Sequence, residues 1–230
     1  LDSNLSDVID LKTGIMARYQ NNFADPGTNV RRLIPDYDKY DLGTYAIANY
    51  KINEKWDIES GLRFDYSYMD AFKYYRSSLW ELRNYDELYP EIVIPRPDLF
   101  NQVLANPELN FSNISATLGT TYSFSDKYKL FFNYSLASRA PNPSELFSEG
   151  LHHSVSRIEI GDLSFNSEIG HKFILTLEKY HNRLNFSISP FLHLINDFIL
   201  IEPIEAEQTK SNAFPVWYYR QTDAQLLGVD

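Results

Sequence analysis

Apolar and polar residues alternate along most of the chain with a period of two. The segment 56–68 shows this most clearly, because one parity is apolar or aromatic apart from Ser60, and the other holds polar or charged residues and Gly61. This period puts successive side chains on opposite faces of a β-strand. The alternation predicts about eight strands, namely residues 9–20, 40–52, 56–68, 113–124, 128–136, 168–178, 184–201 and 219–230.

The connections between these predicted strands alternate in length. Short breaks lie at Asn53, Asp126 and Asn182, whereas the other connections are long and contain most of the prolines. Short turns on one side and long loops on the other are typical of outer-membrane barrels. A soluble sandwich more often mixes loop lengths. The pattern therefore predicts an all-β fold, an antiparallel up-and-down meander that forms a segment of a large transmembrane β-barrel, with extracellular loops and periplasmic turns.

The two faces of the predicted strands differ in chemistry. Aromatic residues make up 15% of the chain, with 17 Tyr and 15 Phe, and the mean hydropathy is −0.37. No apolar run is long enough for a transmembrane helix, but in a barrel only alternate residues face lipid. Charged residues such as Asp57, Glu59, Arg63 and Asp65 share the other parity. Since unpaired charges do not suit a dry core, we expect this face to line a lumen.

Composition excludes several function classes. A net charge of −10 argues against nucleic acid as a partner, because that binding depends on clustered Lys and Arg. The absence of cysteine excludes disulfides and thiolate metal sites. The chain contains no nucleophile-elbow, phosphate-loop or zinc-protease motif. We therefore expect neither an enzyme nor an intrinsic cofactor.

The connection 139–166 carries the candidate ligand-binding residues. His152 and His153 are adjacent, with Glu145, Glu149 and Glu159 near them in the sequence, and imidazole and carboxylate groups suit zinc, copper or iron. The metal hypothesis rests on His152 and His153, although adjacent residues of an extended segment point in opposite directions and could share an ion only at a turn. The alternative interpretation is a solvated polar loop.

Arg139 begins this connection on the inward parity of the preceding strand. Its guanidinium could bind an anionic ligand, and it could equally pair with a barrel carboxylate such as Glu168. Both roles remain open from the sequence.

Four segments resemble TonB-dependent outer-membrane receptors. The first is a strand at 58–66 with a Gly-Leu-Arg sequence, and the second is an Arg-Ala-Pro loop followed by Glu-Leu-Phe at 138–150. The third is a Gly-Asp-x stretch followed by Glu at 161–168, and the fourth is a closing strand with Ala and Gly-Val-Asp at 224–230. The Gly-Asp stretch departs from the family pattern, because Asp162 stands in place of Asn and the usual Pro is missing.

The resemblance implies the barrel of a receptor that imports a scarce nutrient from outside a Gram-negative cell. Such a barrel has roughly 22 strands and a plug, so residues 1–230 are expected to be a partial barrel domain without plug, energy-coupling box or remaining strands. The implied cargo is an iron-siderophore, haem or a metal ion, carried as ligand. The implied partners are outer-membrane lipid, the receptor's own plug and strands, and a TonB-type inner-membrane energy coupler. Alternatives are a passive porin or a secreted β-rich glycan-binding or surface protein.

Overall fold

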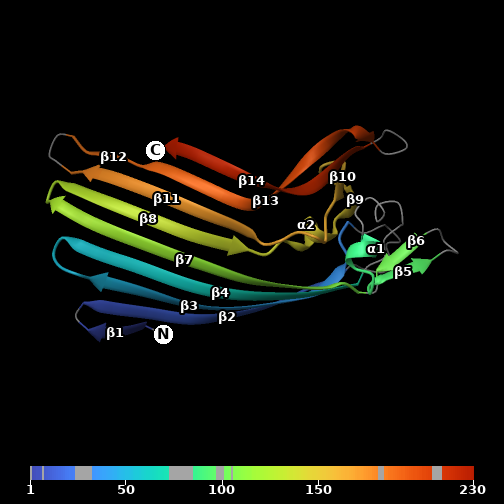
Figure 1. Ribbon diagram of the computed structural model, residues 1–230, viewed down its shortest axis with the longest axis horizontal. Coiled ribbons are helices and arrows are strands. Elements are labelled where there is room, and N and C mark those ends of the chain that lie inside the picture. The colour runs from blue at the N-terminus through green and yellow to red at the C-terminus, as the bar shows by residue number, and fades with distance from the viewer. Residues whose placement is uncertain are drawn as a thin grey trace.

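The computed structural model describes residues 2–6, 8–23, 33–72, 85–96, 101–104, 106–180, 184–208 and 214–230. A curved sheet dominates it (Figure 1). Eight long strands follow one another as antiparallel neighbours in chain order. They are β2 (Ile9–Asn22), β3 (Asp36–Lys51), β4 (Trp56–Phe72), β7 (Glu108–Ser125), β8 (Tyr128–Arg139), β11 (Glu168–Lys179), β13 (Pro190–Gln208) and β14 (Pro215–Val229). The prediction of an all-β antiparallel meander is confirmed.

Eight shorter elements accompany the long strands. They are β1 (Asp2–Ser6), α1 (Tyr85–Leu88), β5 (Val93–Arg96), β6 (Asn101–Leu104), α2 (Pro143–Phe147), β9 (Glu149–His152), β10 (Arg157–Ile160) and β12 (Phe186–Ile188). Apart from β12, which lies within the strand predicted for 184–201, the alternation pattern did not predict them, because four or five residues are too few to establish a period. The β10 strand also departs from a pure meander, since it pairs with β14 in parallel.

Two expectations about the strands need correction. The strand predicted for 184–201 is divided at Ser189 into β12 and β13, because Pro190 has no N–H to donate to the ladder. β12 and β13 nevertheless pair with β11 in the same register, so the pairing is continuous across the break. The long connection predicted for 202–218 is also shorter than expected, since β13 continues to Gln208 and β14 begins at Pro215.

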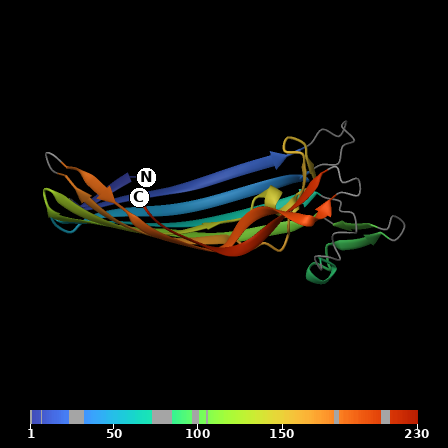
Figure 2. The ribbon, with the colours of Figure 1, turned by 90° about the horizontal axis from the view of Figure 1, so that it is seen from above.

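The two ends of the sheet differ. The turns 53–55 and 126–127 lie at one end, called the turn end, while α1, α2, β5, β6, β9 and β10 gather at the other, called the loop end (Figure 1). The third predicted turn, at Asn182, lies outside the described residues. Figure 2 shows that the strands form an open trough with a concave and a convex face.

Large apolar side chains cover the convex face. Trp56, Phe64 and Tyr66 are exposed there, and no second sheet packs on them within the described ranges. Near the loop end, Tyr19 and Tyr40 lie with ring centroids 5.0 Å apart, and Tyr40 and Tyr68 continue the row at 6.3 Å. Among the described residues, no helix is long and apolar enough to cross a membrane.

A small hydrophobic core lies at the loop end of the trough. It joins side chains from β3, β4, α1, α2, the segment after β10 and β13. Its buried members are Tyr37, Met69, Ala71, Tyr85, Leu146, Phe147, Leu163, Phe165 and Ile199. The connection 139–166 is therefore a folded, packed structure rather than a featureless loop.

Candidate functional site

The connection 139–166 starts with a charge cluster that anchors α2. Arg139 Nη1 lies 2.9 Å from Glu145 Oε2, and Arg139 Nη2 lies 3.1 Å from Glu168 Oε2. Glu145 Oε2 also accepts the backbone N–H of Asn142 at 2.7 Å, while Pro143 occupies the first turn of the helix, where its missing N–H costs nothing. Arg139, Glu145 and Glu168, here called the Arg139 cluster, thus join the end of β8 to α2 and to the start of β11.

Gly161 allows the end of the same connection to approach α2. A Cβ atom at this position would lie 2.6 Å from the backbone oxygen of Glu145 and 2.7 Å from the carbonyl carbon of Leu146. Because the backbone approaches so closely, Gly161 N–H donates to Ser148 O at 2.7 Å and Asp162 N–H donates to Glu145 O at 2.9 Å. The Arg-Ala-Pro and Gly-Asp segments noticed in the sequence therefore contact each other directly.

Two tyrosines from the connection between β4 and β7 also contact residues 162 and 163. Tyr85 lies in α1, and Tyr89 directly follows this helix. The Tyr85 hydroxyl accepts the Leu163 N–H at 2.7 Å and lies 3.2 Å from Asp162 Oδ1. The Tyr89 hydroxyl donates to Leu163 O at 3.1 Å. Burial, with Asp162 and Glu91 nearby, raises the pKa of Tyr89, so its hydroxyl keeps the proton that it donates. The two long connections are thereby fastened together.

The β9–β10 hairpin carries a second charge cluster. Glu159 is only 2% exposed, and its Oε1 atom lies 2.9 Å from His152 Nδ1 and 2.6 Å from Arg157 Nη2. The Arg157 guanidinium also lies over the Trp217 ring, 4.6 Å from its centroid, and the Tyr219 hydroxyl is 3.4 Å from Glu159 Oε2. These five residues, the His152 cluster, share one face because His152 pairs with Arg157 and Glu159 pairs with Trp217.

The predicted site residues are distributed over several places. Arg139 and Glu145 meet in the Arg139 cluster, whereas His152 pairs with Glu159. His153 is exposed in the turn after β9, and Glu149 is buried at the start of that strand. In the described part of the chain, no group of three or more His, Asp or Glu side chains is arranged to hold a metal ion.

Sequence reasoning missed Arg157 and Trp217 as neighbours of His152. The alternation Arg157-Ile158-Glu159-Ile160 was the available signal, because it places Arg157 and Glu159 on one face of an extended segment. Trp217 carried no local signal, since it reaches the cluster only through the parallel pairing of β10 with β14.

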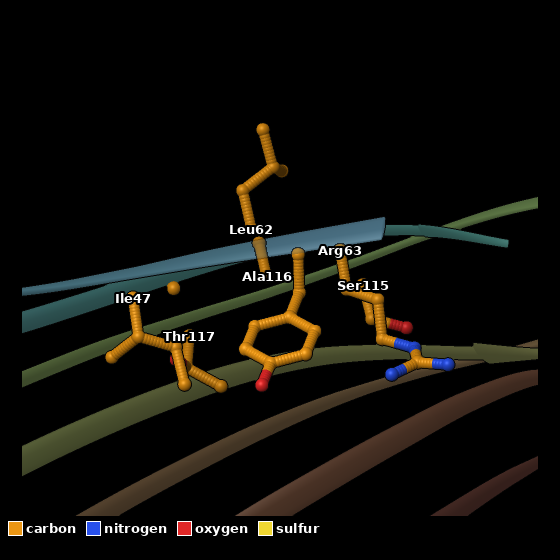
Figure 3. A pocket seen from close by; sticks show the side chains of 8 residues that line it. Ile47, Leu62, Arg63, Ser115, Ala116 and Thr117 are labelled. Atoms are coloured by element: carbon orange, nitrogen blue, oxygen red, sulfur yellow. The ribbon is translucent and has the colours of Figure 1, made fainter. Parts of the chain in front are cut away.

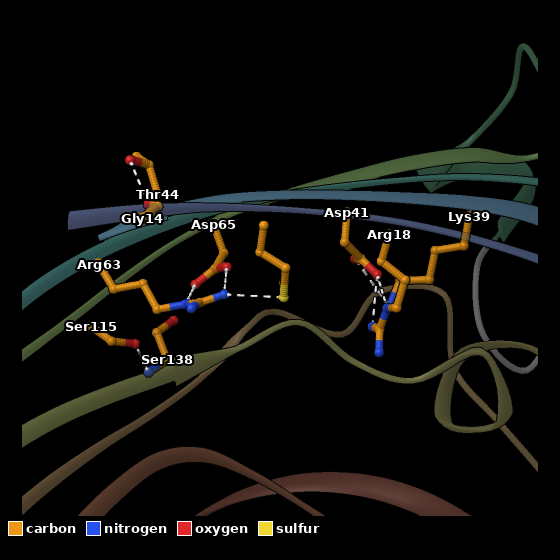
Figure 4. A network of polar contacts seen from close by, with 10 residues as sticks. Gly14, Arg18, Lys39, Asp41, Thr44, Arg63, Asp65, Ser115 and Ser138 are labelled. Atoms are coloured by element: carbon orange, nitrogen blue, oxygen red, sulfur yellow. Dashed lines mark hydrogen bonds and ion pairs between the residues drawn. The ribbon is translucent and has the colours of Figure 1, made fainter. Parts of the chain in front are cut away.

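The concave wall below the loop end is hollowed and carries ion pairs. Figure 3 shows Arg63 and Thr117 pointing to the concave side and Leu62 pointing away from it. Gly61 is one of the residues of β3, β4 and β7 that line a cavity of about 350 Å³. Figure 4 shows ion pairs on the same wall, where Arg63 binds Asp65 at 2.5 Å and Arg18 binds Asp41 at 2.7 Å. The predicted segregation of charges to one face is present.

These contacts suit recognition rather than bond-breaking chemistry. Carboxylates of both clusters are held by cations or backbone N–H groups, which fixes their positions in the loop end. The His153 side chain is exposed to solvent, and the His152 ring is partly exposed.

Comparisons with known proteins agree with this architecture. The sequence model of the family described as "TonB dependent receptor-like, beta-barrel" matches residues 2–230. No curated protein sequence matches. Among solved structures, the copper transporter OprC shares 16% identity with a TM-score of 0.67, over 97% of this chain and 32% of its own.

Two further structures extend the comparison. The hemophore receptor HasR of Serratia marcescens, solved with its hemophore and heme, shares 13% identity over 99% of this chain and 37% of its own, with a TM-score of 0.69. The ferric yersiniabactin uptake receptor FyuA of Yersinia pestis shares 12% identity over 99% and 30%, with a TM-score of 0.55. The chain thus spans about a third of the length of the structures that it matches.

Proposed function

The chain belongs to the TonB-dependent receptor family, and we propose that it builds part of the wall and loops of a receptor for energy-coupled uptake of a scarce nutrient. The nutrient is an iron-siderophore, haem or a metal ion. TonB-dependent receptors are outer-membrane proteins of Gram-negative bacteria, and they are transporters rather than enzymes. The convex face of the trough is accordingly the lipid-facing side, and the row Tyr19, Tyr40 and Tyr68 fits an interfacial aromatic girdle.

One observation, besides family membership, supports the proposal. The folded connections, with their charged and histidine side chains, all gather at one end of a wall that is apolar outside and charged inside. Binding groups held by a rigid scaffold at the mouth of a pore are suited to capturing a solute before it passes along the lumen.

The ligand-facing residues proposed for this mouth are His152, His153, Arg139, Glu145 and Glu149. Three of the structures that resemble this chain are described as a copper transporter, a hemophore receptor in complex with its hemophore and heme, and a ferric yersiniabactin uptake receptor. Copper, iron and haem all accept imidazole ligands, which supports His152 and His153 as metal contacts. No metal or haem is proposed as a resident cofactor.

The mechanism would begin with capture at the loop end. Residues 1–230 would then supply wall and loops, while a plug domain and further strands of the full-length receptor close the barrel. Rearrangement of that plug, driven by a TonB-type inner-membrane energy coupler, would open the path. Energy coupling distinguishes this proposal from a passive porin.

Uptake and binding by the full-length receptor test the proposal. Accumulation of radiolabelled ferric siderophore, haem or copper should stop when the proton-motive force is collapsed, whereas uptake that continues would favour a porin. Calorimetric titration with the same three probes should find one that binds. His152→Ala and His153→Ala should weaken that binding about tenfold or more, and unchanged affinity in both would remove the two residues from the site.

A further inference from the structure

Charged side chains on the convex face are confined to its two ends. Figure 3 shows that Leu62 points away from the concave side, and residues that pair directly across a ladder share a face. The pairings from β2 to β11 therefore identify the outward positions of each strand. These outward positions hold no Asp, Glu, Lys or Arg over residues 9–21, 40–50, 56–68, 110–122, 128–136 and 169–177.

Outward strand positions at the two ends carry opposite charges. At the loop end, Asp38, Asp70 and Glu108 lie directly opposite one another on three neighbouring strands. At the turn end, the outward position that follows Leu177 on β11 is Lys179. The two borders of the uncharged, lipid-facing band are therefore different surfaces for a charged lipid headgroup.

Lys179 lies close to two aromatic rings. Its Nζ atom is 5.7 Å from the centroid of the Tyr128 ring and 5.9 Å from that of the Phe186 ring, because both residues pair with Lys179 across the ladders. Such rings attract an ammonium group through their negative faces. Trp56 and Tyr122, with ring centroids 4.5 Å apart, lie at the same end of the sheet, as aromatic residues do at the headgroup level of a membrane.

No carboxylate neutralises this cation. In the described part of the chain, Lys179 forms no ion pair. Glu178 occupies the opposite face, since successive strand residues alternate, and its carboxylate accepts a hydrogen bond from the Tyr180 hydroxyl. The adjoining turn holds Asp126 and Lys127, whose charges cancel. The ammonium group is thus free to pair with an anion on the lipid side.

An apolar row follows the cation on the same face, toward the middle of the strands. Leu177 lies directly opposite both Leu130 and Ile188, and Ile188 is exposed. A cation at the border with an apolar surface beside it matches the phosphate and the acyl chains of a phospholipid. A soluble anion would use only the first of these two features.

We propose that Lys179, Tyr128 and Phe186 form a headgroup site for an anionic phospholipid in the membrane leaflet at the turn end. The ammonium group pairs with the lipid phosphate, while the acyl chains lie along the apolar row. A zwitterionic headgroup binds more weakly, because its own ammonium group opposes the attraction. The site rests on the proposed function only in taking the convex face as lipid-facing.

Quenching of a fluorophore beside the site tests the proposal in the full-length receptor. A bimane label is placed on Leu175→Cys, an exposed outward residue of β11, after any other cysteine has been replaced by Ser. The receptor is then studied in nanodiscs with dioleoyl lipids brominated on their acyl chains. Brominated phosphatidylglycerol should associate about fivefold more strongly than brominated phosphatidylcholine, as expected for one lysine near an anionic headgroup. Equal quenching by the two lipids would overturn the proposal.

Three variants of the labelled receptor assign the preference to Lys179. Lys179→Gln should abolish it and Lys179→Arg should retain it, because arginine keeps the charge. Lys129→Gln is the matched control, since Lys129 pairs with Glu178 and faces the concave side at the same level. A preference that survives Lys179→Gln, or that Lys129→Gln also abolishes, would contradict the site.

The label position supplies a further control. On Leu62→Cys, an exposed residue in the uncharged band of β4, the same label should report equal association of the two lipids. A preference as large there as at residue 175 would mean that the whole wall selects anionic lipid, against a site at Lys179. These measurements need neither cargo nor energy coupling, so their failure is distinct from failure of the uptake proposal.

Discussion

The turn end and the loop end of the sheet are held together by different interactions. At the turn end, β3 and β4 pair residue by residue, β7 and β8 do so up to a register shift between Ser123 and Ser125, and the connections 53–55 and 126–127 only reverse the chain. At the loop end, where the ladders of β2, β3, β4 and β7 also continue, a small core, two charge clusters and side-chain hydrogen bonds to backbone groups add to the backbone pairing. A ladder is uniform and predictable from alternation, whereas the loop end depends on individual residues. Single substitutions should therefore affect the two ends very differently.

The largest expected effect is from Phe147→Ala. Phe147 is fully buried in the small core, and truncating a buried Phe typically costs 3–5 kcal/mol, that is about 4 kcal/mol here. Amides of α2 and of residues 161–165 should lose protection in hydrogen exchange, while the far-UV circular dichroism of the strands is retained. Phe124→Ala, at an exposed residue of the convex face, is the control. Equal loss of protection in both variants would show that the two ends are not energetically separate.

A smaller effect is expected from Gly161→Ala. The added Cβ would meet backbone atoms of Glu145 and Leu146 at 2.6–2.8 Å, and such overpacking costs about 1–3 kcal/mol. The midpoint of chemical denaturation of the loop end, measured by the fluorescence of Trp217, should shift to a lower denaturant concentration. Gly119→Ala on the wall is the matched control, because its nearest contact is a side-chain oxygen of Asn133 at 3.2 Å. A larger shift for Gly119→Ala would contradict the close-approach argument.

The smallest effect is expected from Asp65→Asn on the concave wall. The Arg63–Asp65 pair is partly exposed, and such pairs contribute roughly 0–1 kcal/mol. Thermal unfolding of the full-length receptor should therefore change little. A loss of stability as large as that expected for Gly161→Ala would mean that the stability of the wall also depends on individual residues.

The sequence predicted the wall far better than the candidate site. The strand 56–68 was recognisable because apolar and polar residues alternate along it with only Ser60 and Gly61 as exceptions, and β4 spans Trp56–Phe72. The hairpin β9–β10 could not be recognised in the same way, since four-residue strands are stabilised by their partners rather than by their own pattern. The neighbourhood of His152 depends on Trp217 and Tyr219, which are distant in sequence and adjacent only through the pairing of β10 with β14. His152 and His153 as metal contacts stay a prediction.

The parallel pairing of β10 with β14 also limits how the barrel wall is extended. On that edge of β14, Val216, Trp217 and Tyr218 already have a partner strand. A neighbouring strand that adds to this edge of β14 can therefore pair only with residues that follow Tyr218. The β9–β10 hairpin thus covers the loop-end part of this edge of β14 and leaves the part toward the turn end as the edge on which the wall can be extended.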